Sequence, residues 1–170
     1  MRCCRIVMRT CCAAQARDER FNELVKTVAP LPGAVELVRW LKETAQVPVA
    51  IATSSNAEYV AVKRAANEEL FSLVDAVITG DDVRIGAGKP APDIFLLGAE
   101  AISVAPEACV SVEDSVAGTA AAAAAGMWVA SLAEPRIPET GYVDAGACAL
   151  SAVGPAAVLA FLKEQHAGKA

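Results

Sequence analysis

Short apolar runs alternate with longer amphipathic stretches from residue 47 to the end of the chain. Most of these runs are continuously apolar rather than alternating, which is typical of strands that are covered on both faces of a parallel sheet. The pattern predicts strands at residues 47–52, 75–79, 109–112, 128–131 and 147–150.

Helical periodicity marks the stretches between these runs and the region before them. In residues 33–44, Val35, Leu37 and Leu41 fall on one apolar stripe while Glu36 lies on the polar face. The pattern predicts helices at residues 17–27, 33–44, 57–69, 92–102, 117–125 and 155–165. Strands that alternate with helices indicate an α/β fold, in which helices flank a parallel sheet.

Length and charge narrow the possible partners. A chain of 170 residues is about one domain. Its net charge of −5, without a cluster of Lys or Arg, predicts that it binds neither nucleic acid nor an anionic membrane. No apolar stretch reaches the roughly 18 residues needed to span a bilayer. We therefore expect a soluble protein. The sequence does not determine its oligomeric state, for which a monomer is the default expectation.

The spacing of the cysteines gives an indication of the cellular compartment of the protein. Cys3 with Cys4, and Cys11 with Cys12, are adjacent pairs that neither bridge readily nor match the spacing of a zinc site. Reduced thiols in the cytoplasm are the simpler interpretation. The first 17 residues carry arginines and no acidic residue, a bias shared with mitochondrial transit peptides, so a mitochondrial location is the alternative.

Three segments place polar groups directly after a predicted strand or in a loop beside one, at the edge where parallel sheets collect their ligands. The first, at residues 52–56, ends a strand with Thr53, Ser54, Ser55 and Asn56 and leads into a helix. Hydroxyls and free N–H groups at a helix start can hold a phosphate oxygen. The same residue types are also ordinary N-caps, and by itself the segment favours the cap.

The second segment is the loop GAGKPAPD at residues 86–93, in which Lys89 lies between glycines and prolines. Pro90 and Pro92 restrict the backbone, so that the lysine ammonium can be aimed at a fixed point. Pro90 stands where a P-loop needs Ser or Thr, which argues against a nucleotide cradle.

The third segment is VSVEDS at residues 110–115, an apolar strand that ends in Glu113 and Asp114. Mg²⁺ prefers oxygen ligands and commonly binds one or two protein carboxylates together with phosphate oxygens and water. Asp114 suits that role. The alternative is that one of the two acids only caps the following helix.

Together the segments resemble the haloacid dehalogenase-like (HAD-like) hydrolases, and among them the β-phosphoglucomutase-like group and the small phosphomonoester phosphatases. The matching stretches are LPGA at 31–34, ATSS at 52–55, GDDV at 80–83, GKPAPDIF at 88–95, EDS at 113–115 and AAAGM at 123–127. The resemblance implies a Rossmann-like core, a parallel sheet flanked by helices, as one domain over residues 18–170. Within it, residues 18–30 would be the remnant of a helical cap, and residues 1–17 are a poorly defined N-terminal segment.

The resemblance also implies roles for individual residues. Thr53 would bind the phosphoryl group with its hydroxyl, helped by the Ser54 backbone, and Lys89 would neutralise the phosphoryl oxygens. Ser55 and Asn56 would contact the rest of a small phosphorylated metabolite, which could be a sugar, glycerol or nucleoside phosphate. The implied cofactor is Mg²⁺.

In the same comparison, Asp114 would bind Mg²⁺ directly and Glu113 would support it. The sequence departs from the family at the first motif, an apolar strand followed by Asp-x-Asp-Gly. The first Asp of that motif attacks phosphorus and the second acts as general acid and base. No Asp precedes Asp18 here, and most of the helical cap is missing as well.

Loss of the first motif affects folding too, because its strand would lie in the centre of the sheet. Both neighbouring strands then lack a partner. The apolar run CRIVM at residues 4–8 could fill this position, with Arg9 and Cys11 roughly where the two aspartates belong.

Two hypotheses of function follow. The first is a Mg²⁺-dependent phosphatase of small phosphomonoesters whose sequence is truncated here, with the first motif upstream, and which is inactive as this chain. The second is a catalytically silent phosphate-binding or scaffold protein of the same fold. A phosphoglucomutase-like phosphotransferase is a further alternative for the full-length form.

Overall fold

The computed structural model describes residues 23–24, 27–132, 136–151 and 154–167. The apolar run at residues 4–8 and most of the predicted helix at 17–27 lie outside these residues. Within the described part of the chain, no helix is long and apolar enough to cross a bilayer.

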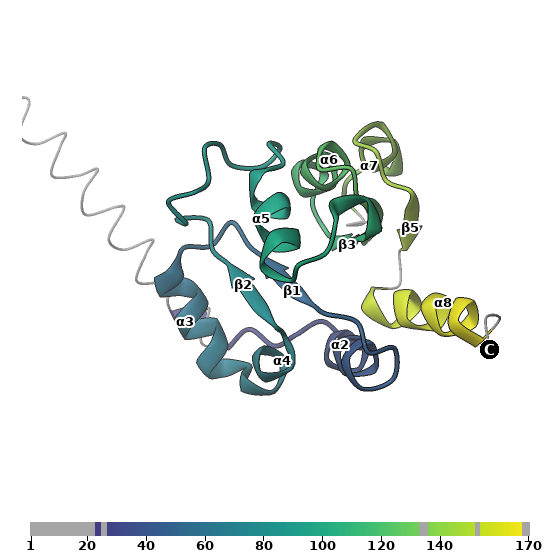
Figure 1. Ribbon diagram of the computed structural model, residues 1–170, viewed down its shortest axis with the longest axis horizontal. Coiled ribbons are helices and arrows are strands. Elements are labelled where there is room, and N and C mark those ends of the chain that lie inside the picture. Colours follow the sequence, from purple (N-terminus) through teal and green to yellow (C-terminus); the bar gives the residue numbers. More distant parts are fainter. Residues whose placement is uncertain (1–22, 25–26, 133–135, 152–153, 168–170) are drawn as a thin grey trace, which may run out of the picture.

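The strands of the described residues form two parallel sheets rather than one (Figure 1). In the first sheet, β1 (Ala50–Ala52) pairs with β2 (Ala76–Ile78). In the second, β4 (Trp128–Leu132) lies between β3 (Val110–Glu113) and β5 (Ala149–Ser151). All pairs are parallel, as predicted, but no strand pairing joins β1 to β3 among the described residues. The expected α/β fold class is confirmed, and within the described residues the sheet divides between β1 and β3.

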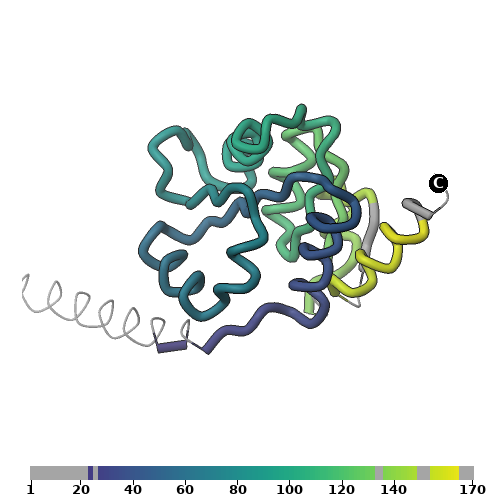
Figure 2. The backbone as a smooth tube through the Cα atoms, turned by 60° about the horizontal axis from the view of Figure 1, so that its bottom comes forward, coloured from purple at the N-terminus to yellow at the C-terminus, as the bar shows by residue number. Residues whose placement is uncertain are grey.

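Helices surround both sheets. They are α2 (Ala34–Glu43), α3 (Ala57–Ala66), α4 (Glu68–Leu73), α5 (Asp93–Ala101), α6 (Val116–Ala124), α7 (Glu139–Asp144) and α8 (Pro155–Ala167), with a short 3-10 helix, η1 (Pro106–Ala108). Helix α5 packs on β1 and β2, and α6 packs on β3 and β4. Helix α2 contacts α4 and α8, and Figure 2 shows the first turns of α8 beside α2.

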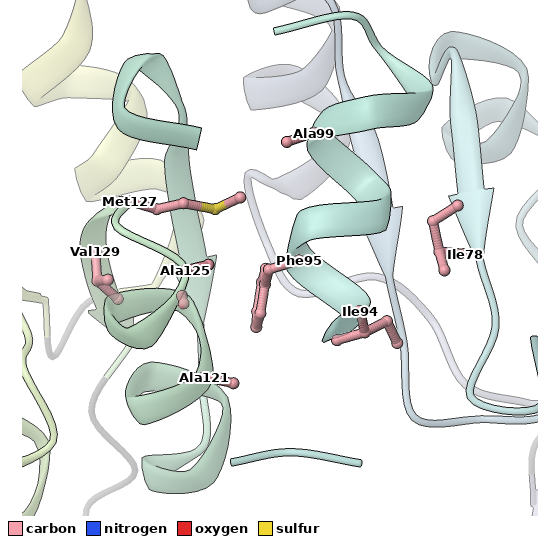
Figure 3. Packing of buried hydrophobic residues seen from close by; sticks show 9 residues of the cluster. Ile78, Ile94, Phe95, Ala99, Ala121, Ala125, Met127 and Val129 are labelled. Carbon is pink, nitrogen blue, oxygen red and sulfur yellow. The ribbon is translucent and has the colours of Figure 1, made fainter. Parts of the chain in front are cut away.

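The apolar core lies where α5 meets α6 and the start of β4. Its buried members are Ile78, Ile94, Phe95, Ala99, Ala121, Ala122, Ala125, Met127 and Val129. Met127 extends across this contact toward the helix that carries Phe95 and Ala99 (Figure 3). The small side chains of α6 let the two helices approach closely, so that this core joins the two sheets in the absence of a ladder between them.

Two helices differ from the sequence prediction. The predicted helix at 57–69 is interrupted at Asn67, whose φ of −136° is not helical. Its side-chain amide donates to the carbonyl oxygens of Lys63 at 2.9 Å and Val28 at 3.1 Å. These bonds fix the break between α3 and α4. Helix α7 was not predicted, because it is short and contains Gly141.

Truncation of the core should be costly and position-dependent. Phe95 is 7% exposed and its neighbour Leu96 is 41% exposed on the same helix. We expect Phe95→Ala to lower the free energy of unfolding by roughly 3–5 kcal/mol, because it leaves a cavity. Leu96→Ala should cost less than about 1 kcal/mol. Urea denaturation measures both, and equal losses would contradict the assigned core.

Candidate active site

Lys89 lies between the carboxyl ends of the two sheets. Its Nζ donates to the carbonyl oxygen of Ala52, the last residue of β1, at 3.4 Å. The same ammonium forms an ion pair with Glu113, the last residue of β3. It also lies 4.7 Å from the centre of the Phe95 ring. The side chain is only 12% exposed, so a largely buried cation links β1 to β3.

The loop that carries Lys89 is held by Asp93, at the start of α5. The Asp93 Oδ2 atom accepts the backbone N–H groups of Gly86 at 2.8 Å and Ala87 at 3.0 Å. These N–H donors, Ala87 first and then Gly86, hold the pKa of Asp93 below its usual value. The Lys89–Pro90 peptide is cis. The sequence analysis assigned no role to Asp93, because its spacing does not mark it as the residue that closes this loop.

Glu113 is 8% exposed, and both of its carboxylate oxygens have partners. One accepts from Lys89, and the other accepts the Ser115 hydroxyl at 3.1 Å. The Ser115 Oγ in turn accepts the N–H of Gly118 at 3.0 Å, which makes Ser115 the N-cap of α6. The alternative that Glu113 or Asp114 caps this helix is therefore wrong.

Asp114 differs from its neighbour in exposure. Its side chain is exposed, and within the described part of the chain its carboxylate has no hydrogen bond or ion pair. Its carbonyl oxygen accepts the hydroxyl of Tyr142 at 2.9 Å, and Tyr142 is fully buried in α7. The backbone at Asp114 is thus fixed while the carboxylate is available to a cation.

The residues after β1 divide into two groups. Thr53 continues the ladder, since its N–H donates to Ile78 at 3.0 Å, and its Oγ1 accepts the N–H of Ser55 at 3.2 Å. Thr53 comes directly after Ala52, whose carbonyl oxygen accepts from Lys89. Ser54 is exposed, and Gly80 packs so closely against its carbonyl group that any side chain at Gly80 would collide with it.

Ser55 and Asn56 are engaged locally. The Ser55 hydroxyl accepts from Lys63 Nζ at 2.8 Å, and the Asn56 side chain accepts the N–H of Tyr59 at 2.9 Å as the N-cap of α3. The cap interpretation is thus confirmed for Asn56. Together with Ser54 and Tyr59, these two residues line an open hollow beside the end of β1.

Asp81 is a residue whose contribution the sequence analysis missed. Its carboxylate accepts the N–H of Ala57 at 3.0 Å and the Thr79 hydroxyl at 2.6 Å. These bonds, the one from Thr79 first, lower the pKa of Asp81. Since Asp81 and Asn56 take the N–H groups of Ala57 and Tyr59, the start of α3 has fewer free donors for an anion than its sequence indicated.

The geometry brings the three predicted segments to one edge. Lys89 contacts Glu113 directly, and Thr53 and Asp114 each follow one of the residues that Lys89 contacts. Among the described residues, no three His, Cys, Asp or Glu side chains converge as a preformed metal cage. One free carboxylate at Asp114 fits Mg²⁺, which commonly completes its coordination with phosphate oxygens and water. Glu113 does not fit as a direct ligand, because its oxygens already have partners.

Solved structures with this fold point to one class. A putative β-phosphoglucomutase from Thermotoga maritima matches with a TM-score of 0.70 and 31% identity, covering 79% of this chain and 60% of that chain. A HAD family hydrolase from Deinococcus radiodurans R1, solved with bound phosphate and sodium, matches with a TM-score of 0.75 and 32% identity, covering 86% of this chain and 65% of that chain. The fold is that of HAD-like α/β hydrolases.

The sequence agrees with this class. The family model of the haloacid dehalogenase-like hydrolases matches residues 6–126. The chain therefore belongs to that family, whose phosphatases generally use Mg²⁺. A probable pseudouridine-5'-phosphatase of Drosophila melanogaster is 41% identical over 129 residues, which cover 73% of this chain and 55% of the relative. The chain spans about half the length of this curated relative.

The position of the Glu113 side chain should make residue 118 intolerant of any residue larger than glycine. A Cβ added at Gly118 would overlap the Glu113 carboxylate, whereas one added at Gly88 meets nothing within 4 Å. Replacing glycine by alanine inside a helix normally stabilises it. We expect Gly118→Ala to destabilise the protein instead, and Gly88→Ala to have little effect. Thermal unfolding compares the two, and a stabilised Gly118→Ala protein would show that Glu113 is not where the structure has it.

The lowered pKa of Asp93 predicts a pH dependence. A depressed pKa contributes stability that is complete above the ordinary value of 3.8 and is lost as pH falls through the lower folded value. Asp93→Asn keeps the shape but not the charge, so it should be less stable than the wild type at neutral pH. The difference should narrow as pH falls below 3.8. Urea denaturation across the acid range tests this, and a difference independent of pH would argue against it.

Proposed function

We propose that this chain binds the phosphate group of a small phosphomonoester together with Mg²⁺, and that the chain as given does not hydrolyse it. The observation that carries this proposal is the position of Lys89. A fixed ammonium with little exposure to water, at the edge where two strands end, is suited to an anionic group.

The proposed roles follow from the contacts. Lys89 Nζ neutralises phosphate oxygens, and the Thr53 hydroxyl and the Ser54 N–H donate to them. The free carboxylate of Asp114 holds Mg²⁺, which neutralises the phosphate charge when it is bound. Glu113 acts on Lys89, because its carboxylate orients the ammonium and compensates its burial.

Hydrolysis through a covalent intermediate needs a carboxylate free to attack phosphorus. Glu113 is paired with Lys89, and Asp114 is assigned to the metal. No aspartate precedes Asp18 in this chain. These facts support a chain that binds phosphate without turnover, and they also suit the second candidate, a silent phosphate-binding protein. The two differ in whether a nucleophile is supplied from outside this sequence.

The substrate class is a small phosphorylated metabolite. The hollow lined by Ser54, Ser55, Asn56 and Tyr59 lies beside Thr53 and offers hydroxyl and amide groups to a sugar or glycerol moiety. Because one relative is named as a probable pseudouridine-5'-phosphatase, we propose nucleoside and sugar monophosphates as the first ligands to test.

The proposal extends to organisation and location. We propose a single monomeric domain over residues 18–170, with residues 18–30 as the remnant of a cap. Cys109 and Cys148 are free thiols, which supports a cytoplasmic protein, with a mitochondrial location as the alternative. Neither nucleic acid nor a membrane is proposed as a partner.

This chain should bind phosphate without hydrolysing a phosphomonoester. We expect calorimetry to detect inorganic phosphate binding that strengthens with Mg²⁺, and a phosphate-release assay to detect no hydrolysis of a phosphomonoester. Lys89→Met should weaken phosphate binding by tenfold or more, which corresponds to about 1.4 kcal/mol. Asp114→Asn should remove the Mg²⁺ effect while leaving a weaker, metal-independent binding.

The matched control is Lys42→Met. Lys42 also forms an ion pair, with Asp75 at 2.7 Å, and its side chain is more exposed than that of Lys89. This pair lies near the amino ends of β1 and β2. The variant should leave phosphate affinity unchanged. Circular dichroism checks that each variant is folded. Equal loss in both lysine variants, or no binding by the wild type, would refute the proposal, and hydrolysis that depends on Lys89 would refute the predicted inactivity.

A further inference from the structure

Lys63, on α3, places its ammonium against a residue that lines the hollow beside the end of β1. Its Nζ donates to the Ser55 hydroxyl at 2.8 Å, and Ser55 lines the hollow. Tyr59, which also lines it, lies four residues before Lys63, so both side chains leave the same face of α3. Lys63 is only partly exposed. A second cation therefore lies next to the proposed substrate position.

The charge of Lys63 is not balanced by an acid in the part of the chain that the structure describes. Lys89 pairs with Glu113, whereas the ammonium of Lys63 is bonded to a neutral hydroxyl and has no carboxylate within ion-pair distance among the described residues. The residues that line the hollow include no acid. Asp81, also near the start of α3, already accepts from a backbone N–H and a hydroxyl. An ammonium with remaining donors and an unbalanced charge is suited to an anionic group of a ligand.

The side-chain groups that the hollow offers are mainly donors. The Ser55 oxygen already accepts from Lys63, which leaves its O–H as a donor. The Asn56 side-chain oxygen accepts the N–H of Tyr59, which leaves the amide NH₂ group, and this group has no partner among the described residues. A sugar hydroxyl both donates and accepts, whereas a carboxylate only accepts. The hollow is therefore better suited to a carboxylate than to a hydroxyl.

Charge and distance restrict the ligand further. One ammonium balances one negative charge, which matches a carboxylate better than a second phosphate group with a charge near −2. Thr53 and Ser55 are two residues apart, so their backbones are separated by at most about 7 Å. The Ser55 N–H donates to Thr53 Oγ1 at 3.2 Å, which holds the two residues together. A carboxylate in the hollow and a phosphate at Thr53 are therefore joined by a short carbon chain.

We propose that Lys63, the Ser55 hydroxyl and the Asn56 amide form a carboxylate subsite, and that the substrate is a short phosphorylated hydroxy acid. This inference rests on the proposed function, because the phosphate of the same molecule lies on Lys89 and Thr53. It narrows the small phosphorylated metabolites from neutral sugar and glycerol phosphates to the corresponding acids. Lys63 is then a residue that determines specificity rather than one that binds the phosphate.

Calorimetry with two ligands that differ at one carbon tests the subsite. 3-Phosphoglycerate has a carboxylate where glycerol 3-phosphate has a hydroxymethyl group. We expect the wild-type chain to bind 3-phosphoglycerate at least about fivefold more tightly, because hydrogen bonds to a charged group are stronger than neutral ones. Lys63→Met should abolish this preference, and Lys63→Arg, which keeps the charge, should retain part of it.

The matched control is Arg64→Met. Arg64 is the next residue of α3, and its guanidinium lies over the Phe71 ring, 5.5 Å from the ring centre, rather than at a residue of the hollow. This variant should keep the preference of the wild type. Circular dichroism checks that each variant is folded. A larger loss for 1,3-propanediol bisphosphate than for 3-phosphoglycerate in Lys63→Met would assign the hollow to phosphate and overturn the proposal.

Two further results would overturn the carboxylate subsite. One is equal affinity of the wild type for 3-phosphoglycerate and glycerol 3-phosphate, a measurement that does not depend on whether any variant folds. The other is a preference that persists in a folded Lys63→Met protein. Inorganic phosphate, measured beside these ligands, separates this inference from the proposed function. Binding of phosphate without discrimination between the two ligands overturns the inference alone, and no binding of phosphate overturns both.

Discussion

The ion pair between Lys89 and Glu113 is the interaction on which the described structure most depends. Its two side chains are 12% and 8% exposed, and a buried charge without a partner is costly. Removal of one partner of such a pair typically costs about 3–5 kcal/mol. Because Lys89 also contacts Ala52, this pair ties the carboxyl end of β1 to that of β3, two strands that no ladder joins in the part of the chain that the structure describes.

Several weaker constraints keep this pair in place. Asp93 closes the glycine-proline loop through two backbone N–H groups, and Ser115 supports the far side of the Glu113 carboxylate. Gly118 leaves room for that carboxylate, while the alanine-rich face of α6 packs against α5. The same contacts that hold the two sheets together therefore position the cation that we assign to phosphate. Stability and the proposed binding site share one set of residues.

Most of the strands and the position of the site could be predicted, because both depend on residues that are close together in the sequence. Continuous apolar runs marked the five strands, and the placement of Lys89 and the Glu113–Asp114 pair beside strand ends marked the edge of the site. The contacts that could not be predicted join residues whose separation in space is set by the course of a loop. Nothing in the spacing distinguishes Asp93 as the residue that closes the loop.

Other features that the sequence analysis did not predict also depend on contacts between separate segments. Asn67 interrupts a predicted helix because Val28, remote in sequence, lies within reach of its side chain. Ser115 caps α6 in place of the neighbouring acids, because Glu113 points to Lys89 instead. The local preference of Ser55 and Asn56 for capping and their proposed contact with substrate are both compatible with the sequence. The structure confirms the capping of Asn56 and leaves the hollow beside it as the proposed substrate position.

The most direct test of the central claim is a crystal structure of this chain with Mg²⁺ and inorganic phosphate. We expect the phosphate at the shared end of β1 and β3, bonded to Lys89 Nζ and the Thr53 hydroxyl, with Mg²⁺ on Asp114. A structure in which Lys89 contacts only Glu113, while phosphate and metal are absent from this edge at saturating concentration, would contradict the account.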